Sequence, residues 1–122
     1  MLNEFRVKVV DGSIDDILWL QLISKIDNTN TLHICSCYLP PEHSTRGNKA
    51  EEVFEQLLTN LLQITDANPI IICGDFNARI GKKIEQSTLQ GRIPIDNSSN
   101  NHGTSLMTFL EDSDSCILNG RI

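Results

Sequence analysis

The feature that most constrains the fold is a short apolar segment, Ile70 to Cys73, which follows an amphipathic segment. All four of its residues are apolar, which is typical of a β-strand covered on both faces. In the preceding segment, apolar residues recur every three or four positions, which predicts a helix with one buried stripe. That stripe comprises Ala50, Val53, Phe54, Leu57, Leu58, Leu61 and Leu62. A buried strand directly after a helix predicts a layered α/β domain.

The first third of the chain predicts three further strands. Apolar and charged residues alternate from Phe5 to Val10, so we expect a half-exposed strand that ends at the turn signal Asp11-Gly12. The segments 17–26 and 31–39 are rich in Ile, Leu and Cys, and a polar turn at 27–30 separates them. They are predicted to form a hairpin.

The remaining segments predict caps, a loop and two short elements. Asn48 is expected to cap the helix that begins near Ala50. Residues 82–102 are polar and predict a long surface loop. After it, Thr104 or Ser105 can cap a short helix, and residues 115–120 predict a last strand and turn.

Composition limits what the chain can bind and where it acts. Its 122 residues suit one small domain, and 39% hydrophobic residues are enough for a core. The net charge of −6 argues against tight, sequence-independent binding of nucleic acid by the chain alone, because such binding neutralises phosphates. We find no apolar run of the roughly 20 residues that a bilayer requires and no signal-peptide pattern. The expected location is intracellular, nuclear or cytoplasmic, without a membrane partner.

The four cysteines are expected to be buried thiols of a reducing compartment. Cys35, Cys37, Cys73 and Cys116 all have apolar neighbours in the sequence. His33, Cys35 and Cys37 alternate and so share one strand face, which a zinc site could use, but no second Cys or His pair follows at ligand spacing. Packing in the core is therefore the favoured interpretation.

Two polar side chains follow the apolar segment 70–73. If residues 74–77 stay extended, Asp75 and Asn77 point to the same side. A carboxylate can hold a metal or accept a proton from water, and an amide can donate to a phosphate oxygen without repelling it. Together they suit metal-assisted phosphodiester chemistry. On spacing alone, an ordinary Asp-Asn turn after a strand explains them equally well.

The wider pattern adds a resemblance to a known family. GDFNARIG after an apolar strand, CYLPP on an earlier strand, and the segments RIPIDNSSNNHGTSLMTFL and CILNGR resemble the endonuclease/exonuclease/phosphatase superfamily. The resemblance is closest to the endonuclease domain of LINE-type (non-LTR) retrotransposons. It implies that residues 1–122 are a partial domain, part of a four-layer α/β sandwich that is incomplete at both ends.

The resemblance also implies roles for individual residues. Asp75 would orient or deprotonate the attacking water, Asn77 would bind the scissile phosphate, and the hydroxyl of Tyr38 would lie beside that phosphate. Asn100 would be a polar residue on the substrate side. The implied cofactor is Mg²⁺ and the implied substrate is a DNA phosphodiester, which the complete domain would nick. Without the resemblance, Tyr38 is better explained as a strand-end tyrosine with its ring in the core.

Some parts of the family pattern are missing from the chain. The metal-binding Glu of the family and its catalytic His have no counterparts, and His33, His43 and His102 stand in other contexts. We therefore expect weak activity or none from this chain by itself, since metal catalysis needs a complete set of ligands. Two alternatives stay open: a phosphomonoesterase of the same superfamily, and a non-catalytic remnant or interaction module. An uncovered sheet is also expected to favour self-association.

Overall fold

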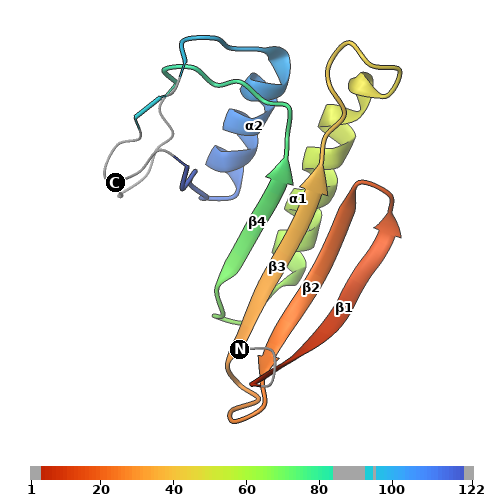
Figure 1. Cartoon of the computed structure of the whole chain (residues 1–122), viewed down its shortest axis with the longest axis vertical. Helices are drawn as coiled ribbons and strands as arrows, with labels where there is room; N and C mark the ends of the chain where they lie inside the picture. The colour runs from red at the N-terminus through yellow and green to blue at the C-terminus, as the bar shows by residue number, and fades with distance from the viewer. Residues whose placement is uncertain (1–3, 84–92, 95, 120–122) are drawn as a thin grey trace. The chain divides into compact units, whose positions relative to one another are not determined.

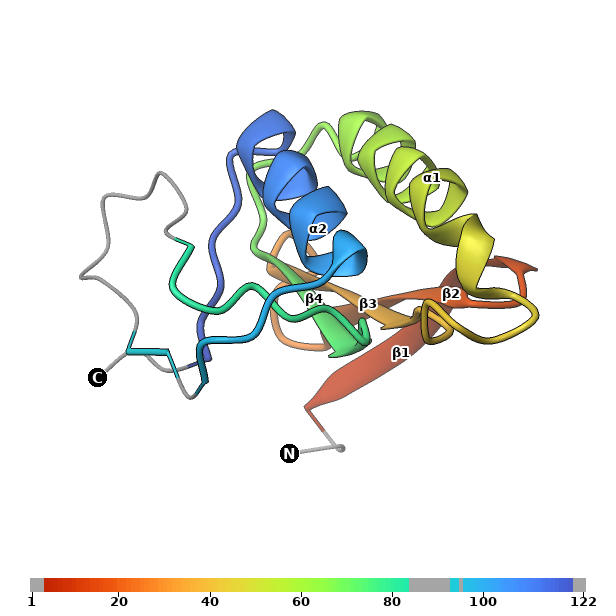
Figure 2. The same cartoon turned by 90° about the horizontal axis from the view of Figure 1, so that it is seen from above.

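The structure is a computed structural model that describes residues 4–83, 93–94 and 96–119. Figures 1 and 2 show it in two views. The elements in chain order are β1 (Phe5–Ile14), β2 (Ile17–Ser24), β3 (Thr31–Tyr38), the 3-10 helix η1 (Gly47–Lys49), α1 (Ala50–Gln63), β4 (Ile70–Asp75) and α2 (Asn101–Asp112). None of the helices in the described residues is long and apolar enough to cross a lipid bilayer.

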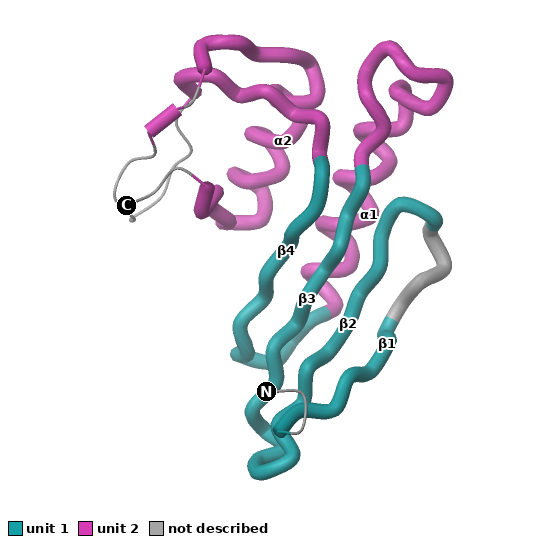
Figure 3. Tube along the Cα trace, viewed as in Figure 1, with its two compact units in different colours: residues 1–38, 64–75 teal, residues 39–63, 76–122 magenta. Residues whose placement is uncertain are grey.

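The chain divides into two compact units, which Figure 3 distinguishes by colour. Unit 1 contains Met1–Tyr38 and Ile64–Asp75, and unit 2 contains Leu39–Gln63 and Phe76–Ile122. All four strands belong to unit 1, and both α-helices belong to unit 2. The predicted α/β class is confirmed.

The sheet of unit 1 has the strand order β1-β2-β3-β4 (Figure 1). β1 and β2 are antiparallel, β2 and β3 are antiparallel, and β3 and β4 are parallel. The predicted hairpin is therefore present as β2 and β3. A parallel pair needs a long connection, and here that connection contains α1.

The two faces of the sheet differ in how far they are covered. On the buried face, Ile17, Trp19, His33, Cys35 and Cys37 are each at most 5% exposed. This confirms the expectation that these thiols pack in the core. Side chains on the other face, here called the open face, are exposed or half-buried. The apolar residues of the open face are Val7, Val9, Leu18, Leu20, Leu22, Leu32, Ile34, Ile71 and Cys73.

The prediction that the segment 70–73 is covered on both faces is wrong. β4 is the last strand in the order of the sheet, and the exposed fractions of Ile70 and Ile71 are 37% and 43%. Cys73 is exposed as well, so not every cysteine is buried. An apolar sequence indicates that a strand can be covered on both faces, not that it is. Which faces are covered depends on the neighbouring elements.

The first strand is longer than its sequence predicted. Asp11-Gly12 does not end β1, which continues to Ile14 and pairs with Ile17 of β2. The register shifts between Val9 and Asp11 and again before Ile14. Bulges of this kind let a strand absorb extra residues without breaking the ladder. Asp11-Gly12 therefore lies at an irregularity in the β1–β2 register and does not form the turn.

In unit 2, α1 and α2 lie side by side (Figure 2). The ring of Phe54 on α1 stacks on Phe76 at a centroid distance of 6.1 Å and packs against Phe109 of α2 at 5.5 Å. The buried part of the predicted α1 stripe is Ala50, Val53, Phe54 and Leu57. Its last residue, Leu62, is 76% exposed, so the stripe is covered only along the first two turns.

Several predicted ends of elements in unit 2 are wrong. Asn48 lies inside η1, which leads directly into α1, so it does not stand at a cap position. The second helix starts at Asn101 and not after Thr104, because the side chain of Asn100 accepts a hydrogen bond from the backbone of Gly103. Residues 115–119 are not a strand, and Gly120 lies outside the described residues. Part of the predicted 82–102 loop, residues 84–92 and 95, lies outside them too.

Candidate functional site

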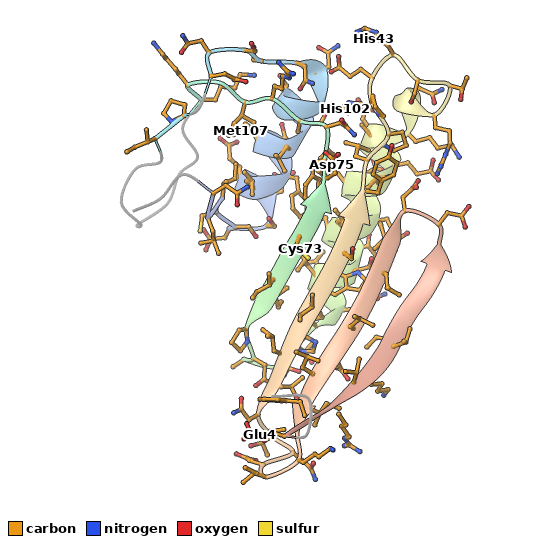
Figure 4. All side chains as sticks on the ribbon, in the orientation of Figure 1. Glu4, His43, Cys73, Asp75, His102 and Met107 are labelled. Carbon is orange, nitrogen blue, oxygen red and sulfur yellow. The ribbon has the colours of Figure 1, made fainter. Side chains whose placement is uncertain are left out.

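Tyr38 and Asp75 are cross-strand neighbours in unit 1. They are the last residues of the parallel strands β3 and β4, and their Cα atoms are partners in the register. Figure 4 places Asp75 at the end of β4. Because the register pairs Ile34 with Ile71 on the same strands, Tyr38 and Asp75 share the open face with them. The carboxyl ends of parallel strands are where α/β proteins bind ligands.

The Tyr38 side chain does not lie in the core. Its exposed fraction is 46%, and Asp75 is exposed as well. The backbone N–H of Tyr38 donates to the carbonyl oxygen of Asp16 at 2.9 Å, which holds the end of β3 against the β1–β2 turn. The structure thus presents a phenol and a carboxylate to solvent from one end of a paired ladder.

Gly74 is the residue that brings the ends of β3 and β4 close together. Its φ of +138° lies in a region that side chains rarely adopt. A Cβ atom at this position would lie 1.8 Å from the carbonyl oxygen of Cys37. Only glycine fits here, one residue before Asp75. The sequence singled out Asp75 and Asn77 in this motif, whereas the requirement for Gly74 follows from the tertiary contact.

The expectation that residues 74–77 stay extended is wrong. β4 ends at Asp75, and Asn77 has a φ of +46° in the left-handed region, which asparagine tolerates better than most residues. The Nδ2 atom of Asn77 donates to the carbonyl oxygen of Leu39 at 2.8 Å. The amide of Asn77 is thus oriented by a backbone group of unit 2, and not by strand alternation.

Asn100 connects the segment after β4 to the start of α2. Its Oδ1 atom accepts the backbone N–H groups of Arg79 and Gly103, both at 2.8 Å. Its Nδ2 atom donates to the carbonyl oxygen of Asn77 at 2.9 Å. A single side chain therefore caps the helix and orders the 77–79 segment. The predicted contact of Asn100 with substrate stays a prediction.

The structure therefore brings the four predicted residues together in two pairs. Tyr38 and Asp75 form a pair in unit 1, while Asn77 and Asn100 are hydrogen-bonded in unit 2. Along the chain, only Phe76 separates Asp75 from Asn77. Each pair combines residues that are 37 or 23 positions apart in the sequence.

His102 and Glu42 form a further cluster in unit 2. The buried ring of His102 forms a hydrogen bond from Nε2 to the carbonyl oxygen of Pro40 at 2.8 Å. A carbonyl oxygen only accepts, so Nε2 carries the hydrogen. The backbone N–H of His102 donates to Oε1 of Glu42 at 2.8 Å. We did not predict this cluster, because its partners are 60 or more positions apart and follow no motif.

The thiols beneath the sheet are poor nucleophiles and poor metal ligands. Burial raises the pKa of Cys35 to about 12, with a smaller contribution from Cys37 and Cys73. Burial and the neighbouring Asp16 carboxylate raise the pKa of Cys37 to about 12. Because the reactive and metal-binding form is the thiolate, both residues stay in their unreactive form at neutral pH.

We tested whether the described residues can hold the Mg²⁺ that the resemblance implies. Mg²⁺ prefers an octahedron of oxygen ligands and is usually held by one or two carboxylates together with substrate phosphates. In the described part of the chain, no three His, Cys, Asp or Glu side chains gather into a group that could hold a metal ion. The described residues therefore do not form a complete set of magnesium ligands by themselves, and Asp75 could supply one carboxylate beside a substrate phosphate.

Comparison with known proteins gave one family. Residues 32–121 match the family model described as endonuclease-reverse transcriptase. The match includes Tyr38, Asp75, Asn77 and Asn100. The comparison with curated proteins gave no match.

Proposed function

The chain belongs to the endonuclease-reverse transcriptase family, a branch of the endonuclease/exonuclease/phosphatase superfamily, and from this premise we propose that it serves to hydrolyse phosphodiester bonds in DNA. The observation that carries the proposal is the pairing of Tyr38 with Asp75 at the exposed carboxyl ends of β3 and β4. A phenol and a carboxylate side by side can bind a phosphate oxygen and a water molecule, respectively.

Each member of the pair has one proposed task. The Asp75 carboxylate accepts a hydrogen bond from the attacking water and takes up its proton, as a general base does. The Tyr38 hydroxyl donates to a non-bridging oxygen of the phosphate, where negative charge grows during attack. Neither task requires the residue to leave its position in the ladder.

Asn77 is proposed to donate to a phosphate oxygen of the DNA backbone. A neutral amide suits this task because it adds no charge that would repel the substrate. The hydrogen bond to the carbonyl oxygen of Leu39 supports the proposal, since it fixes the plane of the amide. An oriented donor loses less freedom when substrate binds than a mobile one.

Basic residues near Asn77 support a polyanionic substrate in spite of the net charge of −6. Arg79, Lys82 and Lys83 follow Asn77 within six positions and are all exposed. The Nζ atom of Lys83 donates to Oγ1 of Thr104 at 2.8 Å, which holds this cation near the start of α2. Local positive charge of this kind can contact backbone phosphates.

The test is nicking of supercoiled plasmid by a molar excess of the chain, with Mg²⁺ or with EDTA. Mg²⁺ is the proposed cation, because members of the family are generally metal-dependent. We expect slow nicking that EDTA abolishes and that Asp75→Asn reduces roughly 100-fold, within the range for loss of a general base. The matched control is Asp112→Asn at the end of α2, which should nick at the wild-type rate.

Three outcomes would contradict the proposal. Equal nicking by wild type and Asp75→Asn would remove Asp75 from the reaction. Release of phosphate from a monoester without plasmid nicking would support a phosphomonoesterase instead. A folded wild-type chain that does neither would support the non-catalytic remnant or interaction module.

The open face supports a second part of the proposal, self-association. Nine of its residues are apolar, and the exposed fractions of Val7, Val9 and Ile71 are 53%, 64% and 43%. Contiguous apolar surfaces are usually buried against another surface. Two sheets can pack face to face through such residues.

A further inference from the structure

We infer that His102 and Glu42 are positioning residues that keep the amide of Asn77 in place. The inference deepens the proposed function, since Asn77 is there assigned to the phosphate. It does not give either residue a contact with substrate. A series of contacts within unit 2 runs from the first turn of α2 through residues 39–42 to Asn77.

The first contacts hold the segment after β3 against the first turn of α2. His102 is 3% exposed, and its Nε2–H group donates to the carbonyl oxygen of Pro40 at 2.8 Å. In a second hydrogen bond, the backbone N–H of His102 donates to the Oε1 atom of Glu42 at 2.8 Å. Residues 40 and 42 are thus both attached to the same residue of α2.

Because the backbone of residues 39–41 is stiff, the attachment of Pro40 to His102 also limits the movement of Leu39. Pro40 and Pro41 have a φ angle locked by their rings, and the residue before a proline is itself restricted. Leu39 and Pro40 each precede a proline. Leu39 is also fully buried. A shift of the Pro40 carbonyl group would therefore move the Leu39 carbonyl group with it.

The last contact reaches Asn77. Its Nδ2 atom donates to the carbonyl oxygen of Leu39 at 2.8 Å, so the position of that oxygen sets the orientation of the amide. Asn100 fixes the backbone of the same residue by donating to the carbonyl oxygen of Asn77. The side chain of Asn77 therefore depends on His102 through Leu39, while its backbone depends on Asn100.

The experiment compares three variants of the full chain. His102→Leu keeps a similar volume and removes the donor to Pro40. His102→Gln keeps an N–H donor about as far from the backbone as Nε2 of histidine. The matched control is His43→Ala, because Figure 4 shows His43 in the loop after β3, and it is exposed. Circular dichroism and thermal unfolding identify any variant that does not fold.

The first readout does not depend on activity. In ¹⁵N-labelled protein, the side-chain amide signal of Asn77 is assigned by its loss in Asn77→Ala. We expect His102→Leu to shift this signal toward that of an exposed asparagine and to speed its exchange with solvent. His102→Gln should keep it near the wild-type position, and His43→Ala should leave it unchanged. A folded His102→Leu variant with an unchanged signal would overturn the inference.

Should His102→Leu fail to fold, Glu42→Ala takes its place, since it removes the acceptor of the His102 backbone N–H and leaves the ring of His102 in place. It should shift the same signal in the same direction, and an unchanged signal would again overturn the inference.

The second readout separates the inference from the proposed function. His102→Leu should lower kcat for nicking about 10-fold with little change in KM, since small misplacement of a catalytic group costs rate. Added to Asn77→Ala, it should cost nothing further. If the Asn77 signal moves but wild type does not nick, the inference holds and the proposed function fails. If wild type nicks and the signal is unmoved in His102→Leu, the inference alone fails.

Discussion

Tyr38 and Asp75 are 37 positions apart in the sequence, yet they are direct partners in the register of two parallel strands. Both are the last residues of their strands, and both are exposed on the open face of the sheet. The sheet itself therefore sets their spacing, because neighbouring strands run about 4.8 Å apart. Pairing of the two strands requires closure of the connection between them, which contains α1.

This pairing predicts a selective effect of Tyr38→Phe. The substitution removes the hydroxyl and keeps the ring, so the free energy of unfolding should change by less than about 0.5 kcal/mol, as for most surface changes. If the hydroxyl donates to the phosphate, kcat for plasmid nicking should fall roughly 100-fold. Nicking by Tyr38→Phe at the wild-type rate would show that the hydroxyl of Tyr38 has no role in the reaction.

Gly74→Ala should destabilise unit 1 strongly. A Cβ atom would lie 1.8 Å from the carbonyl oxygen of Cys37, and the backbone φ is +138°. Strain of this kind costs about 3 kcal/mol or more, measurable by urea unfolding. Ser36→Ala is the control, because Ser36 is exposed on the neighbouring strand, and it should cost less than about 0.5 kcal/mol. Equal stability of the two variants would show that β3 and β4 do not approach so closely.

Ile71→Lys should weaken self-association without unfolding the sheet. Ile71 is 43% exposed on the open face, on the last strand of the sheet, and a charge there would have to be desolvated in a face-to-face dimer. Sedimentation velocity over a range of concentrations should show the wild type associating and the variant staying monomeric. Leu62→Lys is the control, because Leu62 is 76% exposed on α1 and lies outside that face. Monomeric wild-type protein at all concentrations would contradict the proposal.

Asp66 should make stability depend on acid pH. The backbone N–H of Asn68 and then the ring of His33 lower the pKa of Asp66, and His33 Nε2 lies 2.9 Å from the nearer carboxylate oxygen. A lowered pKa means that the stabilisation is complete above the unfolded value, near 3.9, and is lost as the pH falls through the folded value. The melting temperature of the wild type should therefore exceed that of Asp66→Asn at pH 6.

The same comparison at pH 2.5 should show little difference between the two proteins. Asp15→Asn, in the exposed turn after β1, is the control and should follow the wild type at both values. A difference between wild type and Asp66→Asn that does not change with pH would contradict the assignment.

Asn100→Ala should destabilise unit 2, because it removes the cap of α2 and the contacts to Arg79 and Asn77. Loss of such a cap alone costs about 1 kcal/mol. Asn100→Asp keeps an acceptor at the helix start and places a negative charge where the helix dipole favours it, so it should retain more than half of that stability. Urea unfolding of both variants measures the difference. A smaller loss in Asn100→Ala than in Asn100→Asp would contradict the assigned role of the cap.

The sequence by itself determined the elements whose pattern is local. The hairpin of β2 and β3 follows from two apolar runs around a polar turn, and α1 follows from a stripe that repeats every three or four residues. Burial of Cys35 and Cys37 also followed from their neighbours. These predictions succeeded because the period of a helix or strand is a property of the backbone and is visible within a short window.

Only the tertiary structure decided which faces of those elements are covered and which distant residues bond to them. β4 looked like a central strand, but its exposure depends on what stands beside it in the sheet. The hydrogen bonds of Asn77 to Leu39, of Asn100 to Asn77 and of His102 to Pro40 all join residues from distant parts of the chain. A hydrogen bond depends on the distance between two atoms in space, and residues 20 or 60 positions apart acquire that distance only when the chain has folded.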